Sequence, residues 1–579
     1  MSPVVRALLA ALALALTLGG CAGVPTSGPV VAAGSESTIA DDTANDVNPD
    51  PPSRGMTESQ VVEGFLDAMM ASPIDFDVAR QYLTTAAADR WRPEQEMITY
   101  DQVDTVEDSR RVLVTLDDAQ RLSSTGAWLG RLRETEQTIE LRLVYDDGNY
   151  RITNPPDAHL VPVNWFTQRY RQASLYFFDP TGSILVPQPV FVPEGTTLGR
   201  SLIDGLVAGP GPGLATVVRS YLPVGVTADV RVVGSVALVD LEASATVTPG
   251  YSTPTTQRML AQLAETLGED PTIRSLRVTL AGTPIITADG SAEYAVGAAA
   301  GVGPNGADPD TGLYAVRDGV LARRDGRELV PVAGAFGSGR TRVGLAAVDL
   351  SGSRAAGVGL RGRNLLLADL ADPADGTEAT ATQVLQGERL LKPEWDFAER
   401  LWVVDRTRSG AVVRVVRGRQ VREVDVPGVS GQDVRSFLVS RDGTRFLAVV
   451  ASGDGDTVRV GRVESDPEGA VVSVRATEVL VPATSGQAID DIAWASPTSV
   501  TLLSTVDPSF SEVRTIGVDG ASGTEDDVRP VAGPLLGLVG SPLPDLPTYG
   551  ITSTGLLDLV DYDPVDFAGG PPQAVDYAG

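Results

Sequence analysis

Cysteine, histidine and lysine each occur once in this sequence of 579 residues, as Cys21, His159 and Lys392. A single cysteine excludes a disulfide framework, and its position near the start leaves no thiolate catalysis or cysteine-based metal site in the body of the chain. A single histidine means that any Ser-His-Asp arrangement or histidine-bearing zinc site would have to use His159. The chemistry open to the protein is therefore narrow.

Positive charge and long apolar runs are also scarce. The chain has 46 Lys and Arg against 75 Asp and Glu, a formal net charge of −29. Such an acidic surface disfavours nucleic acid as a partner and provides no electrostatic attraction to anionic lipid. After the first apolar run, no segment approaches the ~18 consecutive apolar residues of a membrane-spanning helix. We expect no other part of the chain to cross a bilayer.

The first twenty residues have the layout of a secretory signal peptide. A short positive patch, Met1 to Arg6, precedes the apolar run ALLAALALALTL, Ala7 to Leu18. The run is shorter than the ~20 residues that span a bilayer, and it ends in Gly19 and Gly20 rather than in a stop-transfer flank. We therefore predict cleavage and export, with residues 1–20 as the signal peptide.

The end of that run resembles a bacterial lipobox, formed by Leu18, Gly19, Gly20 and Cys21. The resemblance implies that the Cys21 thiol is alkylated with diacylglycerol and that cleavage makes it the first mature residue. A thiol used for acylation also accounts for the lack of other cysteines, because a spare thiol in an oxidising compartment risks unwanted bridging. We expect a protein held on the extracytoplasmic face of the cell membrane by acyl chains, each buried CH2 contributing about 0.8 kcal/mol.

Residues 21–56 are predicted to be a lipidated, disordered tether. The segment after Cys21 is rich in Ser, Pro, Asp and Gly and has no apolar period. A chain of about 35 such residues spans roughly 33 Å root-mean-square. That length would hold a folded body off the bilayer while leaving it mobile.

An N-terminal α+β domain is predicted for residues 57–160. It begins at TESQ, Thr57 to Gln60, a capping-box pattern in front of apolar residues at helical spacing. After Trp91 the pattern changes to strands, and Asp147-Gly148 marks a hairpin. This order favours a curved sheet with helices on one face, of the nuclear-transport-factor-2-like kind. Such a fold can hold a ligand in its cone or serve as a spacer.

A second α+β domain is predicted for residues 174–290. Two strands around a Gly turn are followed by the helix TLGRSLIDGLVAGPGPG, which Gly209-Pro210 ends. A hairpin at Gly234-Ser235, a helix that starts at Thr253-Pro254 and a last strand complete it. This order, with the elements LVAGP, YLPVGV and VALVDL, resembles the GerMN domain of spore-germination and lipoprotein families.

Residues 295–579 are predicted to form an all-β propeller, because helical periods disappear and strands alternate with polar turns. The turns are 43 to 57 residues apart, near Gly352, Arg400, Gly443, Thr498 and Gly555. A four-stranded blade takes ~40 to 50 residues. The spacing therefore predicts five to seven blades, with six as the best count. Blade packing is favoured over a ligand box for the large side chains of this region, Phe437, Leu438, Trp395, Trp402 and Trp494.

No segment offers a complete catalytic or metal-binding motif. His159 lies in NPPDAHLVP without a Gly-x-Ser-x-Gly elbow elsewhere to serve it, so we expect a surface or linker histidine. The turns Asp308-Pro309-Asp310 and Asp454-Gly455-Asp456 do not continue into an EF-hand loop, so we expect solvated turns. The Gly-rich segment after Val296 lacks the spacing of a phosphate-binding loop. We predict no catalytic residue, no cofactor and no metal, although the many carboxylates leave a carboxylate-only site open.

The whole order of parts resembles the LpqB family of actinobacterial lipoproteins. The features that carry the resemblance are the lipobox, the Pro- and Asp-rich tether, the segment PPSRGMTESQVVEGFLDAM, the GerMN-like domain and the propeller. The resemblance implies a non-catalytic accessory protein that binds the ectodomain of an MtrB-type sensor histidine kinase, in signalling linked to cell division and envelope homeostasis. The alternative is a propeller that binds or hydrolyses cell-wall glycan, which would need paired carboxylates beside exposed aromatic side chains.

Overall fold

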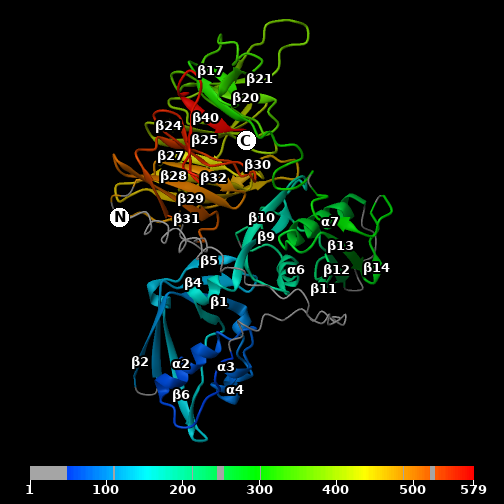
Figure 1. Cartoon of the computed structure of the whole chain (residues 1–579), viewed down its shortest axis with the longest axis vertical. Coiled ribbons are helices and arrows are strands. Elements are labelled where there is room, and N and C mark those ends of the chain that lie inside the picture. Colours follow the sequence, from blue (N-terminus) through cyan, green and yellow to red (C-terminus); the bar gives the residue numbers. More distant parts are fainter. Residues whose placement is uncertain are drawn as a thin grey trace, which may run out of the picture.

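The computed structural model describes residues 48–579 apart from 109–110, 212, 244–252, 288, 300, 485, 487 and 522–527. The predicted signal peptide, the lipobox with Cys21, and the tether up to residue 47 lie outside the described residues. Figure 1 shows three folded parts: an N-terminal domain at one end of an elongated molecule, a middle domain at its side, and a large all-β domain at the other end.

The N-terminal domain combines short helices with two β-sheets. Its elements in chain order are α2 (Glu58–Ala68), α3 (Asp77–Gln81), α4 (Thr85–Ala88), the 3-10 helix η2 (Pro93–Gln95), β1 (Glu96–Tyr100), β2 (Gln102–Glu107), β3 (Arg111–Asp117), β4 (Gln120–Ser123), β5 (Trp128–Arg131), η3 (Glu134–Glu136), β6 (Thr138–Asp146), β7 (Asn149–Ile152), β8 (His159–Pro162) and α5 (Val163–Thr167). The strands form the sheets β2-β3-β6-β7 and β5-β4-β1-β8. Because only Asp101 separates β1 from β2, one bent strand runs through both sheets. Helix α2 contacts β2, β3 and β7, and its Val61 and Phe65 pack in the core with Leu116 of β3.

Order begins earlier in the chain than the composition predicts. The capping box is confirmed: the Thr57 hydroxyl oxygen accepts from the Gln60 N–H at 3.2 Å, and the Gln60 side chain accepts from the Thr57 N–H at 2.9 Å. Upstream of it, however, the Tyr82 hydroxyl donates to the Asp50 carbonyl oxygen at 2.8 Å, and Met56 packs against the domain core. This last part of the predicted tether therefore belongs to the folded body, because these contacts hold it there.

The N-terminal domain also ends later than the predicted residue 160. Strand β8 pairs in parallel with β1, with Met97 opposite His159 and Tyr100 opposite Pro162, and α5 follows it directly. The prolines before His159 lead into the last strand of the domain. A parallel pairing between distant strands leaves no local signal in the sequence.

The middle domain has helices α6 and α7 packed on a β-sheet. Its elements are β9 (Tyr170–Phe178), β10 (Leu185–Pro193), α6 (Leu198–Ala208), β11 (Thr227–Val233), β12 (Val236–Glu242), α7 (Thr253–Leu267), β13 (Ser275–Leu280), β14 (Thr283–Pro284) and β15 (Tyr294–Ala295). Strands β11-β12-β13-β14 form the sheet, with β15 also on β13, and β9 pairs with β10. The β11–β12 hairpin turns at Gly234 (φ 63°), and α6 ends at Gly209 (φ 91°), both in the left-handed region that favours glycine. The predicted hairpin and helix end are thus confirmed.

The C-terminal domain is a β-propeller. Its strands are β16 (Leu313–Arg317), β17 (Val320–Asp325), β18 (Glu328–Pro331), β19 (Val343–Val348), β20 (Arg354–Gly359), β21 (Asn364–Asp369), β22 (Thr382–Gln386), β23 (Glu394–Trp395), β24 (Leu401–Thr407), β25 (Gly410–Arg417), β26 (Gln420–Glu423), β27 (Asp433–Val439), β28 (Arg445–Ala451), β29 (Thr457–Ser465), β30 (Val471–Val474), β31 (Glu478–Val481), β32 (Asp491–Ser496), β33 (Ser499–Asp507), β34 (Phe510–Gly517), β35 (Val528–Ala532), β36 (Gly537–Val539), β37 (Tyr549–Ile551), β38 (Leu556–Asp558), β39 (Pro564–Val565) and β40 (Ala574–Tyr577). Consecutive strands form sheets from β19, β23, β27, β32 and β36 onward, and β40 joins β18-β17-β16 in the remaining one. The described residues of this domain therefore form six sheets.

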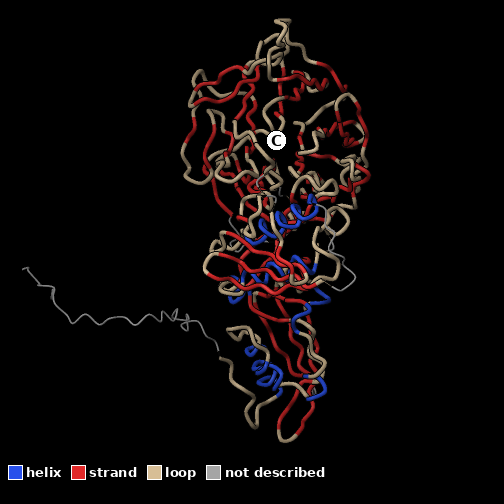
Figure 2. Tube along the Cα trace, turned by 90° about the vertical axis from the view of Figure 1, so that its right-hand side faces the viewer, coloured by secondary structure: helices blue, strands red, loops and turns tan. Residues whose placement is uncertain are grey.

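These sheets close into a ring around their innermost strands. Each such strand contacts the next, in the order β19, β23, β27, β32, β36 and β40, and β40 contacts β19 again. The ring is closed by β40 from the end of the chain pairing with β16 from the start of the domain, with Leu313 opposite Tyr577. In Figure 2 the strands of this domain lie around the C-terminus.

The large side chains of the propeller pack within it, as predicted. Five of them are no more than 4 % exposed, namely Trp395, Trp402, Trp494, Phe437 and Leu438. The indole N–H of Trp395 donates to the Ala347 carbonyl oxygen at 3.2 Å. Such buried and bonded rings serve packing rather than a ligand box.

Candidate functional site

Of the predicted site residues, Leu18, Gly19, Gly20 and Cys21 lie outside the described residues, and the described body begins after them at Asn48. In the described ranges, no helix is long and apolar enough to cross a membrane.

His159 is buried, which corrects the prediction of a surface or linker histidine. It is 4 % exposed and lies between the rings of Phe76 and Trp165, at centroid distances of 5.0 and 5.5 Å. Its Nε2 is 2.8 Å from the Met69 carbonyl oxygen. Because a carbonyl only accepts, Nε2 carries the proton and Nδ1 is the acceptor. Burial lowers the pKa of His159 to about 4. The ring is therefore neutral, and its partner is not the carboxylate that orients a catalytic base.

The second aspartate of each Asp-rich turn is bonded within the protein. Asp310 accepts from the Tyr314 hydroxyl at 2.8 Å. Asp456 accepts from the Ile489 N–H at 2.8 Å and pairs with the Arg435 guanidinium at 2.8 Å. The prediction of solvated turns is wrong for these two carboxylates, because each is bonded to other groups of the protein. Within the part of the chain that the structure describes, no group of three or more His, Cys, Asp or Glu side chains could hold a metal ion.

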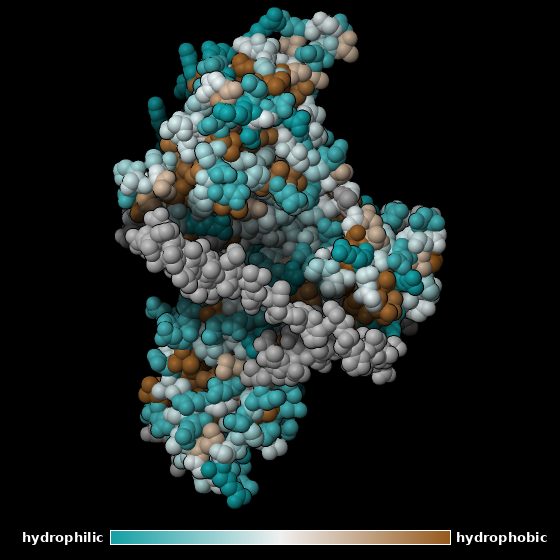
Figure 3. Space-filling view, in the orientation of Figure 1, coloured by the Kyte–Doolittle hydropathy of each residue, from teal (hydrophilic) through white to brown (hydrophobic). Residues whose placement is uncertain are grey.

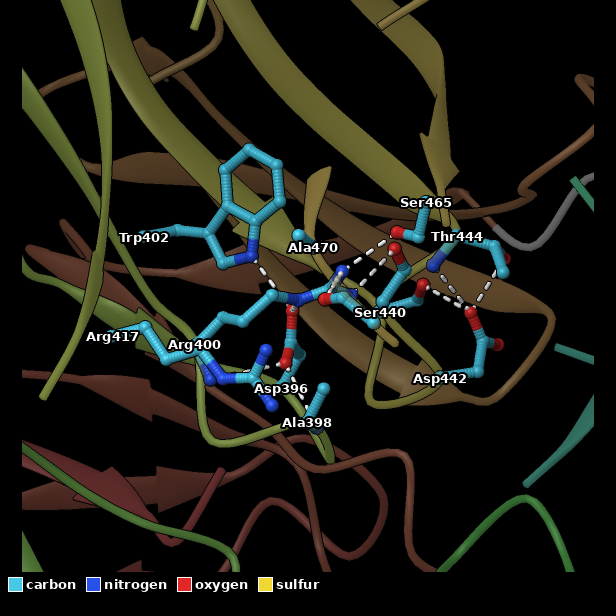
Figure 4. Close-up of polar contacts among 12 residues, drawn as sticks. Asp396, Ala398, Arg400, Trp402, Arg417, Ser440, Asp442, Thr444, Ser465 and Ala470 are labelled. Atoms are coloured by element: carbon cyan, nitrogen blue, oxygen red, sulfur yellow. Dashed lines mark hydrogen bonds and ion pairs between the residues drawn. The ribbon is translucent and has the colours of Figure 1, made fainter. Parts of the chain in front are cut away.

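A turn of the propeller carries a buried ion pair that joins two neighbouring sheets (Figure 4). Arg400 Nε donates to Asp396 Oδ2 at 2.6 Å, and the Trp402 indole N–H donates to the same oxygen at 2.8 Å. Arg400 also donates to Ser465 Oγ at 2.7 Å and to the Gly443 carbonyl oxygen at 3.2 Å, both on the next sheet. Because these bonds connect two neighbouring sheets, they hold the blades together.

The equivalent turn of the next sheet reaches the middle domain. Asp442 accepts from the Ser440 hydroxyl at 2.7 Å and from the Thr444 N–H at 2.8 Å, and Arg445 lies 3.3 Å from the same carboxylate. The other end of the Arg445 guanidinium donates to the Pro187 carbonyl oxygen of β10. Arg445 is 1 % exposed. A buried cation of the propeller thus bonds to the backbone of the middle domain.

One hydrophobic cluster contains residues of all three domains. It includes Met97 of the N-terminal domain, Phe191 of the middle domain and Ala521 of the propeller. The Phe191 N–H also donates to the Gly126 carbonyl oxygen at 2.8 Å, joining the first two domains. Because the three domains share this buried apolar cluster, their outer surfaces lie next to one another and form one larger surface.

The chain's lysine lies among carboxylates of the innermost strands. Lys392 Nζ is 2.6 Å from Asp576 Oδ2 and 2.9 Å from Glu394 Oε1. Glu394 lies in β23 and Asp576 in the closing strand β40, so this ion pair connects two sheets of the ring. Burial and neighbouring carboxylates raise the pKa of Glu394 to about 7. Burial also raises the pKa values of Asp576 and Asp491. The one available signal in the sequence was that Lys392 is unique.

The cleft between the N-terminal domain and the propeller has acidic walls. It encloses about 620 Å³ and is lined by Trp128, by four carboxylates and by two guanidinium groups, namely those of Asp456, Glu478, Glu512, Asp519, Arg131 and Arg514. Carboxylates beside an aromatic ring are what a glycan site would need. The Trp128 ring, however, packs so closely on Gly520 that a Cβ there would lie 3.0 Å from Cζ3. The Trp128 ring therefore takes part in the contact between the N-terminal domain and the propeller.

Exposed apolar side chains are found on all three domains and are not concentrated on one of them. The face shown in Figure 3 is mixed, with hydrophobic residues scattered among hydrophilic ones. Large apolar side chains are exposed on every domain, as Tyr145 (67 %), Val224 (94 %) and Leu536 (67 %) illustrate.

Three family descriptions match successive parts of the chain. Residues 51–167 match "Lipoprotein LpqB, N-terminal domain", residues 174–286 match "Sporulation and spore germination", and residues 319–555 match "Lipoprotein LpqB beta-propeller domain". The middle match supports the resemblance to the GerMN domain.

Relatives named lipoprotein LpqB show the same similarity over most of their length. Lipoprotein LpqB of Thermobifida fusca (strain YX) is 31 % identical over 512 residues, which cover 78 % of this chain and 80 % of the relative. Lipoprotein LpqB of Mycobacterium bovis (strain BCG / Pasteur 1173P2) is 30 % identical over 76 % of this chain and 77 % of the relative. That of Cutibacterium acnes (strain DSM 16379 / KPA171202) is 28 % identical over 90 % of each. At 30 % identity or more over more than two thirds of each of the first two relatives, the similarity shows that this chain belongs to the LpqB lipoprotein family.

Proposed function

We propose that this chain is a lipid-anchored, non-catalytic binding protein of the cell envelope that docks on the ectodomain of a sensor histidine kinase and modulates its signalling. The observation that supports this proposal best is that the three domains are joined into one body by buried contacts. Met97, Phe191 and Ala521 of the three domains pack in one cluster, and Arg445 bonds to Pro187 across a domain boundary. Such a body offers a large composite surface of the kind that a protein partner needs.

The proposed anchor is the acylated thiol of Cys21, exported by the signal peptide of residues 1–20. Two or more acyl chains, such as palmitate, would make attachment durable. An anchor restricts the body to a layer next to the membrane and so raises its effective concentration for a partner in the same bilayer. Even a weak interface would then be populated. The family of lipoproteins to which the chain belongs supports this assignment.

We also propose a fold type for the N-terminal domain and a blade number for the propeller. The bent strand β1–β2, with α2 on one face of the sheet, supports a nuclear-transport-factor-2-like N-terminal domain. The ring of six sheets supports a propeller of six blades.

We propose that the protein catalyses no reaction because its candidate catalytic groups are already bonded within the protein. The His159 imidazole donates to the Met69 carbonyl oxygen, and Asp456 is held by Arg435. The alternative, a glycan-binding or glycan-hydrolysing propeller, would use the acidic cleft beside Trp128. We place it second because the Trp128 ring is packed against Gly520.

Calorimetry tests the proposal. Residues 48–579, titrated with the purified ectodomain of the sensor kinase from the same organism, should give a saturable heat of binding, weaker than the anchored pair shows in the envelope. The proposal fails if no such ectodomain binds and the protein releases soluble sugars from purified cell wall.

A further inference from the structure

A cavity of about 460 Å³ lies between the N-terminal and middle domains, separate from the acidic cleft of the propeller. Its walls include Phe76, Met97 and His159 from the first domain and Tyr170 and Phe191 from the second. The volume lies within the range of about 300–1,000 Å³ that small-molecule sites occupy, and such sites often lie between domains.

One polar group of the cavity wall is the imidazole of His159. Other polar and charged lining residues are Glu94, Glu96, Ser123, Ser124, Thr125, Ser201 and Asp204. Nε2 of His159 donates to the Met69 carbonyl oxygen, so Nδ1 is an acceptor without a proton. The ring is 4 % exposed and contributes to the cavity wall. A ligand that donates a hydrogen bond to Nδ1 would gain an interaction that a ligand without a donor cannot make.

The charge of the walls restricts the ligand further. His159 is neutral, and burial raises the pKa of the Tyr170 phenol, which keeps that group neutral as well. Of the three carboxylates that line the cavity, Glu96 pairs with Arg121 at 3.3 Å, Asp204 pairs with Arg200 at 3.7 Å, and Glu94 is exposed. An anion would meet these carboxylates and no cationic side chain among the lining residues, and a cation would have to compete with Arg121 and Arg200. A charged ligand would therefore lose its hydration at a cost.

We propose that the cavity between the N-terminal and middle domains binds an uncharged, mainly apolar small molecule that donates one hydrogen bond, from a hydroxyl or N–H group, to Nδ1 of His159. Because the walls come from two domains, the bound molecule contacts both of them. Occupancy would stabilise their contact and so the composite surface that they form.

A fluorescent probe tests the proposal on residues 48–579. N-phenylnaphthylamine is neutral, brightens in apolar surroundings and carries one N–H group; its N-methyl analogue lacks that donor. We expect saturable binding of one probe per chain, and weaker binding of the analogue. Because the chain has a single histidine, nitrogen-labelled histidine gives one imidazole in the NMR spectrum. Its Nδ1 resonance should move with the probe and not with the analogue.

Two matched variants locate the site. Ile74 lines the cavity and is 39 % exposed, so Ile74→Ala should leave the fold intact. It should weaken probe binding about fivefold, from the loss of roughly 1 kcal/mol of apolar contact. Ile286 is 54 % exposed and does not line this cavity, so Ile286→Ala should bind like the original chain. The proposal is overturned if probe and analogue bind equally, if the Nδ1 resonance does not move, or if the two variants behave alike.

Discussion

Arg445, at the start of β28 in the propeller, donates a hydrogen bond to the carbonyl oxygen of Pro187 on β10 of the middle domain, 258 residues away in the sequence. The same guanidinium lies 3.3 Å from the Asp442 carboxylate. One buried side chain therefore stabilises a propeller turn and connects it to another domain.

Replacing Arg445 should weaken this connection. Arg445→Met leaves the Asp442 charge and the Pro187 carbonyl group buried without their cationic donor, which should lower the free energy of unfolding by about 3 kcal/mol. Scanning calorimetry should show a lower midpoint and separate transitions for the middle domain and the propeller. Arg408 is exposed, and Arg408→Met serves as the matched control. If both variants melt like the original chain, Arg445 does not join the domains.

The ring of the propeller should be less stable at high pH. Glu394 has a pKa of about 7 in the folded protein against an ordinary value of 4.5, so the folded state holds more protons than the unfolded state between these values. Its stability contribution is present at low pH and is lost as the pH rises through about 7. Glu394→Gln cannot ionise and should raise stability at about pH 8 by roughly 1–3 kcal/mol, with a smaller gain at about pH 5.

Denaturant unfolding across this pH range measures the effect. Glu388 is exposed, and Glu388→Gln should reproduce the original pH dependence. An equal loss of stability with pH in the original chain and in Glu394→Gln would show that another group causes it.

The segment before α2 should contribute to stability. A protein that begins at Thr57 lacks the Asp50 carbonyl oxygen that accepts from Tyr82 and the packing of Met56. Compared with a protein that begins at Asn48, it should lose about 1–3 kcal/mol. Tyr82→Phe in the longer protein should lose only the hydrogen bond, about 1 kcal/mol. If the long and short proteins melt at the same temperature, residues 48–56 do not stabilise the folded body and belong to the tether.

Lipid attachment should depend on Cys21 alone. Cys21→Ser removes the only thiol in the sequence, so labelled fatty acid should no longer be incorporated and the protein should be released or remain unprocessed. A variant that still incorporates label and stays in the membrane after a carbonate wash would disprove the lipobox assignment.

Local signals in the sequence predicted local structure. The capping box of Thr57 and Gln60 depends on residues three positions apart, and the hairpin at Gly234 depends on a turn that tolerates positive φ. The repeated strands and turns predicted the propeller for the same reason. Each pattern is complete within a short segment.

Contacts between distant residues could not be predicted in this way. His159 is buried because β8 pairs with β1, which the surrounding prolines do not indicate. Lys392 is bonded to Asp576, 184 residues away, and its uniqueness was the single hint of that role. Such contacts arise only when the sheets and domains assemble.

The central claim is that this protein docks on a sensor kinase ectodomain while anchored in the membrane, and crosslinking in the native envelope tests it most directly. Photo-reactive residues at the exposed positions Tyr145, Val224 and Leu536 sample the three domains, and mass spectrometry identifies what they capture. We predict crosslinks from at least one position to the kinase ectodomain, much reduced in the Cys21→Ser protein. Crosslinks to cell-wall glycan from positions on the propeller, with none to the kinase from any position, would contradict the account.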